Sequence, residues 1–216
     1  MFNIDIYNEI SQKIKDFSKK TKIVAVSKNH PKIAVEKAIT YGINIFGENR
    51  VQEAQAKFMD LKKNHIDLEL HLTGPLQTNK VKDAVKLFDI FHTLDREKLA
   101  KEFSKVGGVE NKKFFIQVNT GKEKTKSGIY LEELNQFVNY CKIDLSLNII
   151  GLMCIPPIND DPKKHFSLLA KNAKKNNLPH LSMGMSADYM DAVELNATYI
   201  RIGTALFGER KQWKLK

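Results

Sequence analysis

Short apolar runs alternate along the chain with longer stretches in which apolar residues recur at helical spacing. The short runs are rich in β-branched and aromatic residues and end in glycine or polar residues, as buried parallel strands do. They predict eight strands: Ile23–Ser27, Ile43–Gly47, Leu68–Gly74, Ile90–Leu94, Phe114–Asn119, Asn148–Ile155, His180–Met183 and Tyr199–Gly203. The longer stretches predict eight helices: Ile4–Lys19, Pro31–Tyr41, Val51–Asn64, Asn79–Leu87, Arg96–Lys105, Leu131–Cys141, Lys163–Lys175 and Ala187–Leu195.

Strands that alternate with helices imply right-handed crossovers and parallel pairing. The pattern therefore predicts an α/β fold, a single (β/α)8 TIM barrel with an extra N-terminal helix, at a length below the usual size of such barrels. A doubly wound open sheet is the competing architecture, and it normally carries a glycine-rich turn after its first strand. The segment Ser27–Pro31 contains no glycine. No linker or repeat divides the chain, so we expect one domain over residues 1–216.

Composition places the protein among soluble globular chains, with 42% hydrophobic and 28% charged residues. No apolar run approaches the roughly 18 residues of a membrane span, and the polar N-terminus lacks the apolar core of a signal peptide. We therefore expect a cytoplasmic protein that does not bind membranes. Cys141 and Cys154 have no metal-ligand spacing, and in that compartment they are expected to be reduced.

The net charge of +10 would permit attraction to nucleic acid or to anionic ligands. Most of the basic residues are lysines spread along predicted helices, apart from short clusters such as Lys62-Lys63 and the terminal segment Lys211–Lys216. No RRM, KH or zinc-finger pattern is present. The charge thus indicates a solvated surface, and no specific nucleic-acid partner is expected.

The first predicted strand raises a chemical question, because four apolar residues, Ile23–Val26, lead directly into Ser27-Lys28. Lysine is rarely buried, and its ammonium is costly in an apolar setting. Lys28 either extends into water or holds its amine at a site for chemistry. In a barrel of this type, active sites lie at the carboxyl ends of the strands, which is where Lys28 stands.

Two further strand ends carry anion-binding features. Ser182–Ser186 places a glycine between two serines, with Ser186 as a candidate helix N-cap and Asp188 in the first turn. Arg201–Thr204 supplies another glycine, a hydroxyl and a guanidinium. Loops after the seventh and eighth strands commonly bind phosphate in such barrels. A lysine across from a phosphate site suits an aldehyde cofactor that carries a phosphate, because a primary amine forms a Schiff base with an aldehyde.

Seven segments in order between Lys22 and Gly208 carry a family resemblance: AVSKNHP, FGENRVQEA, HLTGPLQTNK, KSGI, GLMCIPP, LSMGMSADYMDAV and IRIGTALFG. They resemble the pyridoxal phosphate homeostasis proteins, whose fold is similar to the N-terminal barrel of alanine racemase (fold type III among pyridoxal-phosphate proteins). The resemblance implies pyridoxal 5'-phosphate as cofactor, Lys28 as the Schiff-base lysine, Asn49 beside the ring and Arg201 facing the pyridine nitrogen. It also implies a set of residues around the phosphate: Ser182, Gly184, Met185, Ser186, Gly203 and Thr204. Arg50 stands where many members have an aromatic residue.

The resemblance leaves three functions to weigh: a carrier that holds and releases pyridoxal phosphate, an amino-acid racemase of the same fold type, and a basic interaction module. Racemisation benefits from acid–base groups on both faces of the substrate α-carbon. In the related racemases the second group is a tyrosine from an additional domain of the partner subunit, and this chain ends at Lys216 without one. Tyr189 is the tyrosine nearest to the expected phosphate loop, and a packing role is expected for it. An interaction module does not explain why Lys28 occurs together with both anion loops.

We therefore expect a non-catalytic carrier that takes part in intracellular pyridoxal phosphate homeostasis, delivers the cofactor to pyridoxal-phosphate-dependent apoenzymes and is a monomer. Arg201 fits this reading, because a donor-only neighbour keeps the pyridine nitrogen unprotonated and so restrains carbanion chemistry. His71 and His92 lie within predicted strands and are expected inside the barrel, since no pair of histidines has metal-site spacing. Glu48 is expected to orient a loop or to form a surface ion pair.

Overall fold

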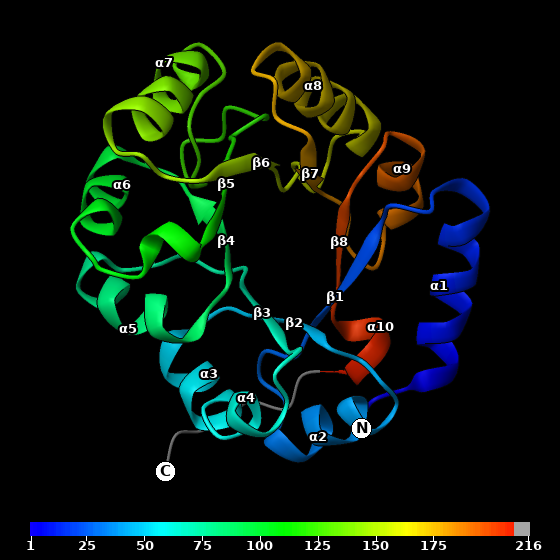
Figure 1. Cartoon of the computed structure of the whole chain (residues 1–216). Coiled ribbons are helices and arrows are strands. Elements are labelled where there is room, and N and C mark those ends of the chain that lie inside the picture. Colours follow the sequence, from blue (N-terminus) through cyan, green and yellow to red (C-terminus); the bar gives the residue numbers. More distant parts are fainter. Residues whose placement is uncertain (210–216) are drawn as a thin grey trace.

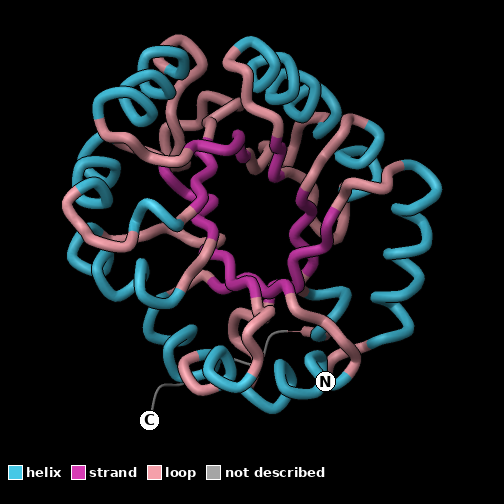
Figure 2. Tube along the Cα trace, viewed as in Figure 1, coloured by secondary structure: helices cyan, strands magenta, loops and turns pink. Residues whose placement is uncertain are grey.

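Eight parallel strands close into a barrel in chain order, and β8 pairs with β1. The computed structural model describes residues 1–209, so the basic segment Lys211–Lys216 lies outside the described residues. The strands are β1 (Lys22–Val26), β2 (Ile45–Glu48), β3 (Glu69–Leu72), β4 (Ile90–Leu94), β5 (Lys113–Gln117), β6 (Ile149–Met153), β7 (His180–Ser182) and β8 (Tyr199–Ile202). The predicted (β/α)8 barrel is confirmed, and Figure 2 shows the ring of strands inside a ring of helices.

The helices cover the outside of the barrel, one after another around the ring (Figure 1). They are α1 (Ile4–Phe17), α2 (Lys32–Thr40), α3 (Val51–Phe58), α4 (Leu61–Asn64), α5 (Val81–Leu87), α6 (Glu97–Ser104), α7 (Leu134–Asn139), α8 (Pro162–Lys175), α9 (Tyr189–Glu194) and α10 (Thr204–Phe207). Three short turns complete the described elements: η1 (Thr78–Lys80), η2 (Val109–Asn111) and η3 (Tyr140–Asp144).

Two predicted helices are divided in the structure. The stretch predicted as Val51–Asn64 forms α3 and α4, separated by Met59 and Asp60, which keep helical backbone angles. The division is therefore a change in hydrogen bonding and not a loop. The stretch predicted from Leu131 becomes helical only at Leu134, and it continues past α7 as the wider turn η3.

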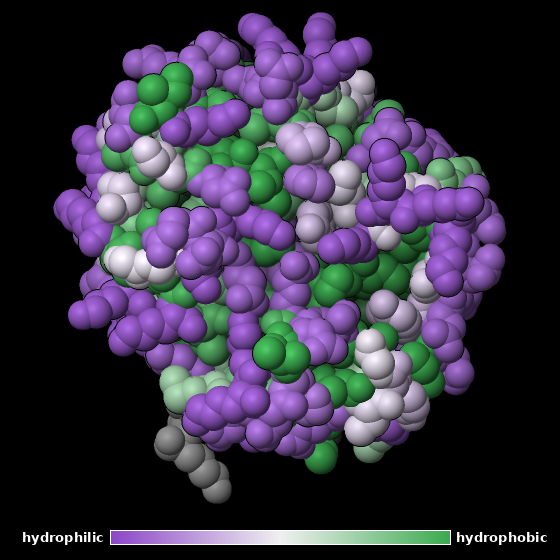
Figure 3. Space-filling view, in the orientation of Figure 1, coloured by the Kyte–Doolittle hydropathy of each residue, from purple (hydrophilic) through white to green (hydrophobic). Residues whose placement is uncertain are grey.

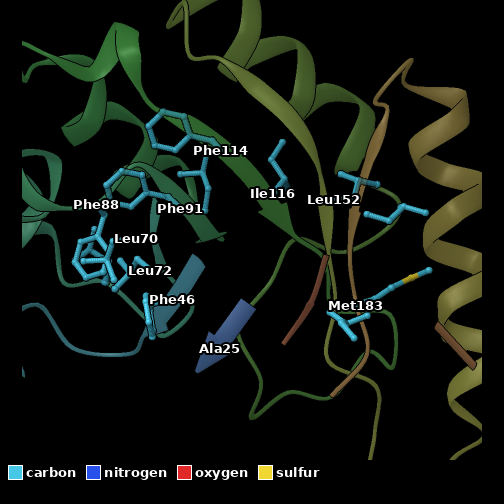
Figure 4. Close-up of a cluster of buried hydrophobic side chains, with 14 of the residues drawn as sticks. Ala25, Phe46, Leu70, Leu72, Phe88, Phe91, Phe114, Ile116, Leu152 and Met183 are labelled. Carbon is cyan, nitrogen blue, oxygen red and sulfur yellow. The ribbon is translucent and has the colours of Figure 1, made fainter. Parts of the chain in front are cut away.

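The larger hydrophobic core lies between the barrel and its helices. Outward-facing strand residues such as Phe46, Leu72 and Phe114 are fully buried there (Figure 4). Rings of Phe91 and Phe114 stack with centroids 5.2 Å apart, and Phe103 of α6 meets Phe91 edge-on at 4.8 Å. Because this layer fixes each strand against its helix, it also fixes the loop that follows each strand.

The barrel interior has a smaller apolar cluster combined with polar side chains. Val24, Phe115 and Tyr199 belong to the cluster. His71 and His92 lie among these residues with no exposed surface, and their rings are 5.0 Å apart. The prediction that both histidines are interior residues is confirmed.

The extra N-terminal helix packs near the closure of the barrel. Asn3 caps α1 by accepting a hydrogen bond from the Ile6 amide, and its own amide donates to the Leu206 carbonyl oxygen at 2.8 Å. The Phe2 ring contacts Phe207, with the two ring centroids 5.2 Å apart.

Within residues 1–209 no helix is long and apolar enough to cross a membrane. The face in Figure 3 is largely hydrophilic at its rim, with hydrophobic side chains between.

Candidate functional site

A cavity of about 310 Å³ lies at the carboxyl ends of the strands. The lining comes from the end of β1 and the loop after it, from the loops after β2, β3, β6 and β7, and from β8 and the loop after it. These residues are Val26, Lys28, Asn49, Thr73, Ile155, Met185, Ser186, Ala187, Arg201, Gly203 and Thr204. Seven of the nine residues proposed from the sequence are in this set. The other two, Ser182 and Gly184, lie beside it and are described below.

The loop that carries Lys28 is held on both sides of that residue. Lys57 Nζ donates to the Ser27 carbonyl oxygen at 2.8 Å, and the Asn29 amide donates to Glu53 Oε1 at 2.5 Å. Asn29 adopts a left-handed conformation with φ 62°, which turns the chain sharply after the strand. Lys28 is thereby presented to the cavity from a fixed backbone.

The groups that hold this loop form a buried charged cluster of Glu48, Glu53 and Lys57. Lys57 Nζ lies 2.9 Å from Glu48 Oε1 and 2.6 Å from Glu53 Oε1, and all three side chains are at most 3% exposed. Ser27 Oγ also donates to Glu48 Oε1. Burial raises the pKa of Glu48 to about 7, against the opposing effect of Lys57. Of the two roles expected for Glu48, the surface ion pair is wrong, because the side chain points from β2 toward α3 and its ion pair is buried. Its contact with Ser27 Oγ fits the other expected role, the orientation of a loop.

Asn49 is oriented by the neighbouring strand end. Thr73 Oγ1 donates to Asn49 Oδ1 at 3.0 Å, which leaves the amide nitrogen of Asn49 as a donor. Gly74 allows this approach, because a Cβ there would lie 2.4 Å from the Asn49 carbonyl oxygen. Thr73 was not among the residues proposed from the sequence. It could have been found from its position at the carboxyl end of a predicted strand, since the carboxyl ends of the strands form the site.

The two predicted phosphate loops meet at one side of the cavity. Met185 and Ser186 come from the loop after β7, and Gly203 and Thr204 follow β8. Gly203 packs against β1, where an added Cβ would lie 3.2 Å from the Val26 carbonyl oxygen. Thr204 also begins the short helix α10, which the sequence pattern did not predict.

Ser186 does not cap the helix that follows it. Helix α9 begins at Tyr189 with Asp188 in the N-cap position, and Asp188 Oδ1 accepts from the Met185 amide at 2.6 Å. The predicted N-cap is wrong because Asp188 reaches back to hold the loop, which leaves Ser186 on the cavity wall. Gly184, with φ 88°, sits under α9, where a Cβ would meet Ala192 at 2.6 Å. Because Gly184 has no Cβ, the loop after β7 can pass directly beneath α9.

Arg201 forms part of the cavity wall from inside the barrel. Its Nη1 donates to Ser182 Oγ at 2.6 Å and its Nη2 to the Cys154 carbonyl oxygen at 3.0 Å. Burial lowers the pKa of Arg201 from its usual value, but a guanidinium stays protonated in proteins. Ser182 is fully buried and lies behind Arg201 rather than on the cavity wall.

Two larger hollows lie at the outer side of the barrel mouth. One, of about 730 Å³, is bounded by α6 and α7, and the other, of about 650 Å³, shares Asn49 with the candidate site. Neither is lined by Lys28 or by the loops after β7 and β8. We place the candidate site in the smaller cavity, because it alone among these three brings Lys28 and Arg201 together with the loops after β7 and β8.

The cavity wall is limited in its acid–base groups. Among the described residues, 1–209, Lys28 and Arg201 are the only titratable ones that line it, and no tyrosine is on the wall. Tyr189 lies at the start of α9, and burial raises the pKa of Tyr199, in the barrel interior, to about 12. In the described part of the chain, no group of three or more His, Cys, Asp or Glu side chains is arranged to hold a metal ion.

Comparison with known proteins shows the family of the chain. The sequence model of the alanine racemase N-terminal domain matches residues 7–211. A pyridoxal phosphate homeostasis protein of Aquifex aeolicus is 40% identical over 201 residues, which cover 88% of this chain and 87% of the relative. The chain belongs to the pyridoxal phosphate homeostasis protein family. The resemblance inferred from the sequence motifs is confirmed.

Solved structures are similar to this barrel. PipY of Synechococcus elongatus, solved with pyridoxal phosphate bound, is 34% identical, with a TM-score of 0.81 over 94% of this chain and all of that one. Alanine racemase from Acinetobacter baumannii matches 96% of this chain and 62% of its own at a TM-score of 0.74 and 16% identity. That likeness is one of fold alone.

Proposed function

We propose that this family member binds pyridoxal 5'-phosphate as a Schiff base on Lys28 and holds it for intracellular homeostasis without turnover. One observation carries the proposal: a single cavity joins Lys28 after β1 to Ser186 after β7 and to Arg201 and Thr204 of β8 and its loop. PipY, a relative that covers nearly the whole chain, has been solved with this ligand bound. The family name supports the homeostatic role.

The residues present fit such a cofactor. A cavity of about 310 Å³ is at the small end of the range for ligand pockets, which suits one substituted pyridine ring. Gly203 and Thr204 place the backbone after β8 on the cavity wall, where its N–H groups could meet an anion. The hydroxyls of Ser186 and Thr204 add donors for a phosphate there, and Arg201 offers further N–H groups at the cavity floor. Asn49 would contribute its amide nitrogen beside the ring.

Lys28 supplies the chemistry of attachment. Its primary amine would add to the aldehyde carbon and lose water, so that a C=N bond replaces the C=O bond. The reverse hydrolysis, or transfer to another amine, releases the ligand without an oxidant or reductant. Reversible attachment of this kind is what a carrier needs, and pyridoxal-phosphate-dependent apoenzymes are the proposed recipients. We propose a cytoplasmic monomer that acts as one domain over residues 1–216.

An amino-acid racemase of the same fold type is the alternative. The cavity wall offers one titratable group besides the arginine, and that group is Lys28. A second acid–base group for the opposite face of a substrate is absent from the wall in the part of the chain that the structure describes. This favours holding over turnover, because proton exchange at an α-carbon benefits from a group on each face.

The test of binding is an absorption spectrum with pyridoxal phosphate added, followed by borohydride reduction and mass mapping of the modified peptide. We expect a visible band that reduction removes, with the label on Lys28. Lys28→Arg keeps the positive charge but cannot condense, so its band should be absent. Lys32→Arg is the matched control on the exposed start of α2 and should behave like the wild type.

A protein that takes up no pyridoxal phosphate would contradict the proposal and favour the basic interaction module. A label on a different lysine would overturn the assignment of Lys28 alone. Formation of the opposite enantiomer from a single amino-acid enantiomer, catalysed by the loaded protein and absent in Lys28→Arg, would establish the racemase instead.

A further inference from the structure

A chain of hydrogen bonds runs through the barrel interior from its amino-terminal end to the candidate site. Glu69, the first residue of β3, has Oε1 2.9 Å from His71 Nε2. His71 Nδ1 is 2.8 Å from His92 Nε2, and His92 Nδ1 is 2.7 Å from Ser182 Oγ. Ser182 Oγ in turn accepts from Arg201 Nη1 at 2.6 Å. The chain thus links four strands and ends on the cavity wall.

The Glu69 end of this chain sets the direction of its protons, because Ser182 Oγ can accept from Arg201 in either direction. Arg201 can only donate, and an ionised Glu69 can only accept. The hydrogen bond from His71 lowers the pKa of Glu69, and the charges of Lys22 and Lys113 act in the same direction. His71 must therefore carry its proton on Nε2 and accept at Nδ1. The same argument gives His92 a proton on Nε2 and makes Ser182 the donor to its Nδ1.

Both histidines are neutral in this arrangement. Burial lowers the pKa of His71, against the opposing effect of Glu69. Burial lowers the pKa of His92 well below its usual value, and His71 and Arg201 add to the shift. A cationic His71 would donate from both ring nitrogens and would reverse the bond to His92. Neutral rings keep the direction from Arg201 to Glu69 intact.

We infer that Glu69 is a remote positioning residue for Arg201, acting through His71, His92 and Ser182. Its carboxylate sets the direction of the chain, so the Ser182 hydroxyl proton points to His92 and its lone pairs point to Arg201. The guanidinium is then held by an acceptor on Nη1 and by the Cys154 carbonyl on Nη2. The remaining N–H groups keep one orientation toward the ligand. The inference rests on the proposed function for what that ligand is.

The reverse direction has a distinct outcome that can be measured. If His92 donated from Nδ1, Ser182 would accept twice and its own proton would be free to turn elsewhere. A neutral amide in place of Glu69 permits this, because its NH₂ group can donate to His71 Nε2. Glu69→Gln therefore tests the direction with almost no change in shape.

The first measurement is ¹⁵N NMR of the histidine rings in the ligand-free protein. We expect His71 and His92 to be protonated on Nε2 alone, and Glu69→Gln to add a form protonated on Nδ1. Glu36→Gln removes a carboxylate from the exposed pair with Lys32 and should leave both rings unchanged. Nδ1 protonation in the wild type, or rings in Glu69→Gln that match the wild type, would overturn the inference.

The second measurement is the dissociation constant for pyridoxal phosphate. Ser182→Ala should bind about tenfold more weakly, as for a lost hydrogen bond to a charged group, while borohydride still labels Lys28 at saturation. Glu69→Gln should weaken binding in the same direction, and Glu36→Gln should not. Equal affinities in all three variants would overturn the positioning role. A wild type that binds no pyridoxal phosphate would defeat the proposed function instead, while the ring protonation still decides the direction of the chain.

Discussion

The ammonium of Lys57 donates a 2.8 Å hydrogen bond to the carbonyl oxygen of Ser27, the residue before Lys28. Lys57 also pairs with Glu48 and Glu53, so one buried cation links both carboxylates to the backbone of the loop. Paired buried charges are costly to separate, because the remaining partner stays desolvated. The conformation of the loop that presents Lys28 therefore depends on this buried cluster.

Lys57→Met is expected to lower the free energy of unfolding by about 3–5 kcal/mol, since it leaves buried carboxylates without their cation. Urea denaturation at neutral pH measures the loss. Lys13→Met removes the cation of an exposed pair on α1 and should leave stability nearly unchanged. Equal effects of the two substitutions would contradict the role given to the cluster.

Glu48 should make stability depend on pH. Its pKa is about 7 in the folded protein against 4.5 for an ordinary glutamate, so the folded state holds this proton more tightly than the unfolded state. The free energy of unfolding should therefore fall as pH rises through this window, by about 3 kcal/mol for this group. Glu48→Gln should flatten the fall. Urea denaturation at pH 5 and pH 8 tests it, and an unchanged slope in the variant would contradict the assignment.

Gly184→Ala separates backbone strain from steric overlap when it is compared with Gly42→Ala. Both glycines have positive φ, 88° and 82°, but only Gly184 has a neighbour, Ala192, within contact of an added Cβ. Gly42→Ala should cost about 1 kcal/mol of stability from the backbone alone. Gly184→Ala should cost clearly more, because the loop after β7 must also move away from α9. If thermal denaturation shows the same loss of stability for both variants, α9 can shift away from the added Cβ at little cost in free energy.

Thr73→Val removes the hydroxyl that orients Asn49 and keeps the shape of the side chain. On the proposed function, the affinity for pyridoxal phosphate should fall about fivefold, the value of one ordinary hydrogen bond. Thr40→Val, on the exposed end of α2, is the control and should bind normally. If the two variants bind equally well, the orientation of Asn49 has no part in binding.

The cysteines should be inert in the folded protein. Burial raises the pKa of both Cys141 and Cys154 to about 12, so almost no thiolate exists near neutral pH. An alkylating reagent should label neither residue until denaturant is added. Rapid labelling of either one under native conditions would show that its surroundings open.

The sequence predicted the barrel and most of the cavity wall because each rests on local signals. An apolar run that ends in Lys28, and a glycine flanked by Met183 and Met185, can be read from a few neighbouring letters. Lys28 and Thr204 could be assigned to one site because strand ends of a parallel barrel share one face. The assigned roles of these residues remain predictions until ligand binding is measured.

What could not be predicted depends on the direction of side chains across strands far apart in sequence. Ser182 was grouped with the phosphate residues by its position in the motif, but it lies inside the barrel behind Arg201. Glu48 was expected at the start of a loop, and its burial depends on α3, which covers β2 and supplies Lys57. The bond between His71 and His92 joins neighbouring strands, and no spacing rule connects them.

The closure of the barrel by β1 and β8 has a consequence for the newly made chain. Lys28 is synthesised well before Arg201 and Thr204. The cavity needs all three, so a partial chain has the lysine without the opposite wall. On the proposed function, a chain synthesised only as far as β7 would bind its ligand poorly. Ligand capture would then report that β8 has paired with β1 and closed the ring.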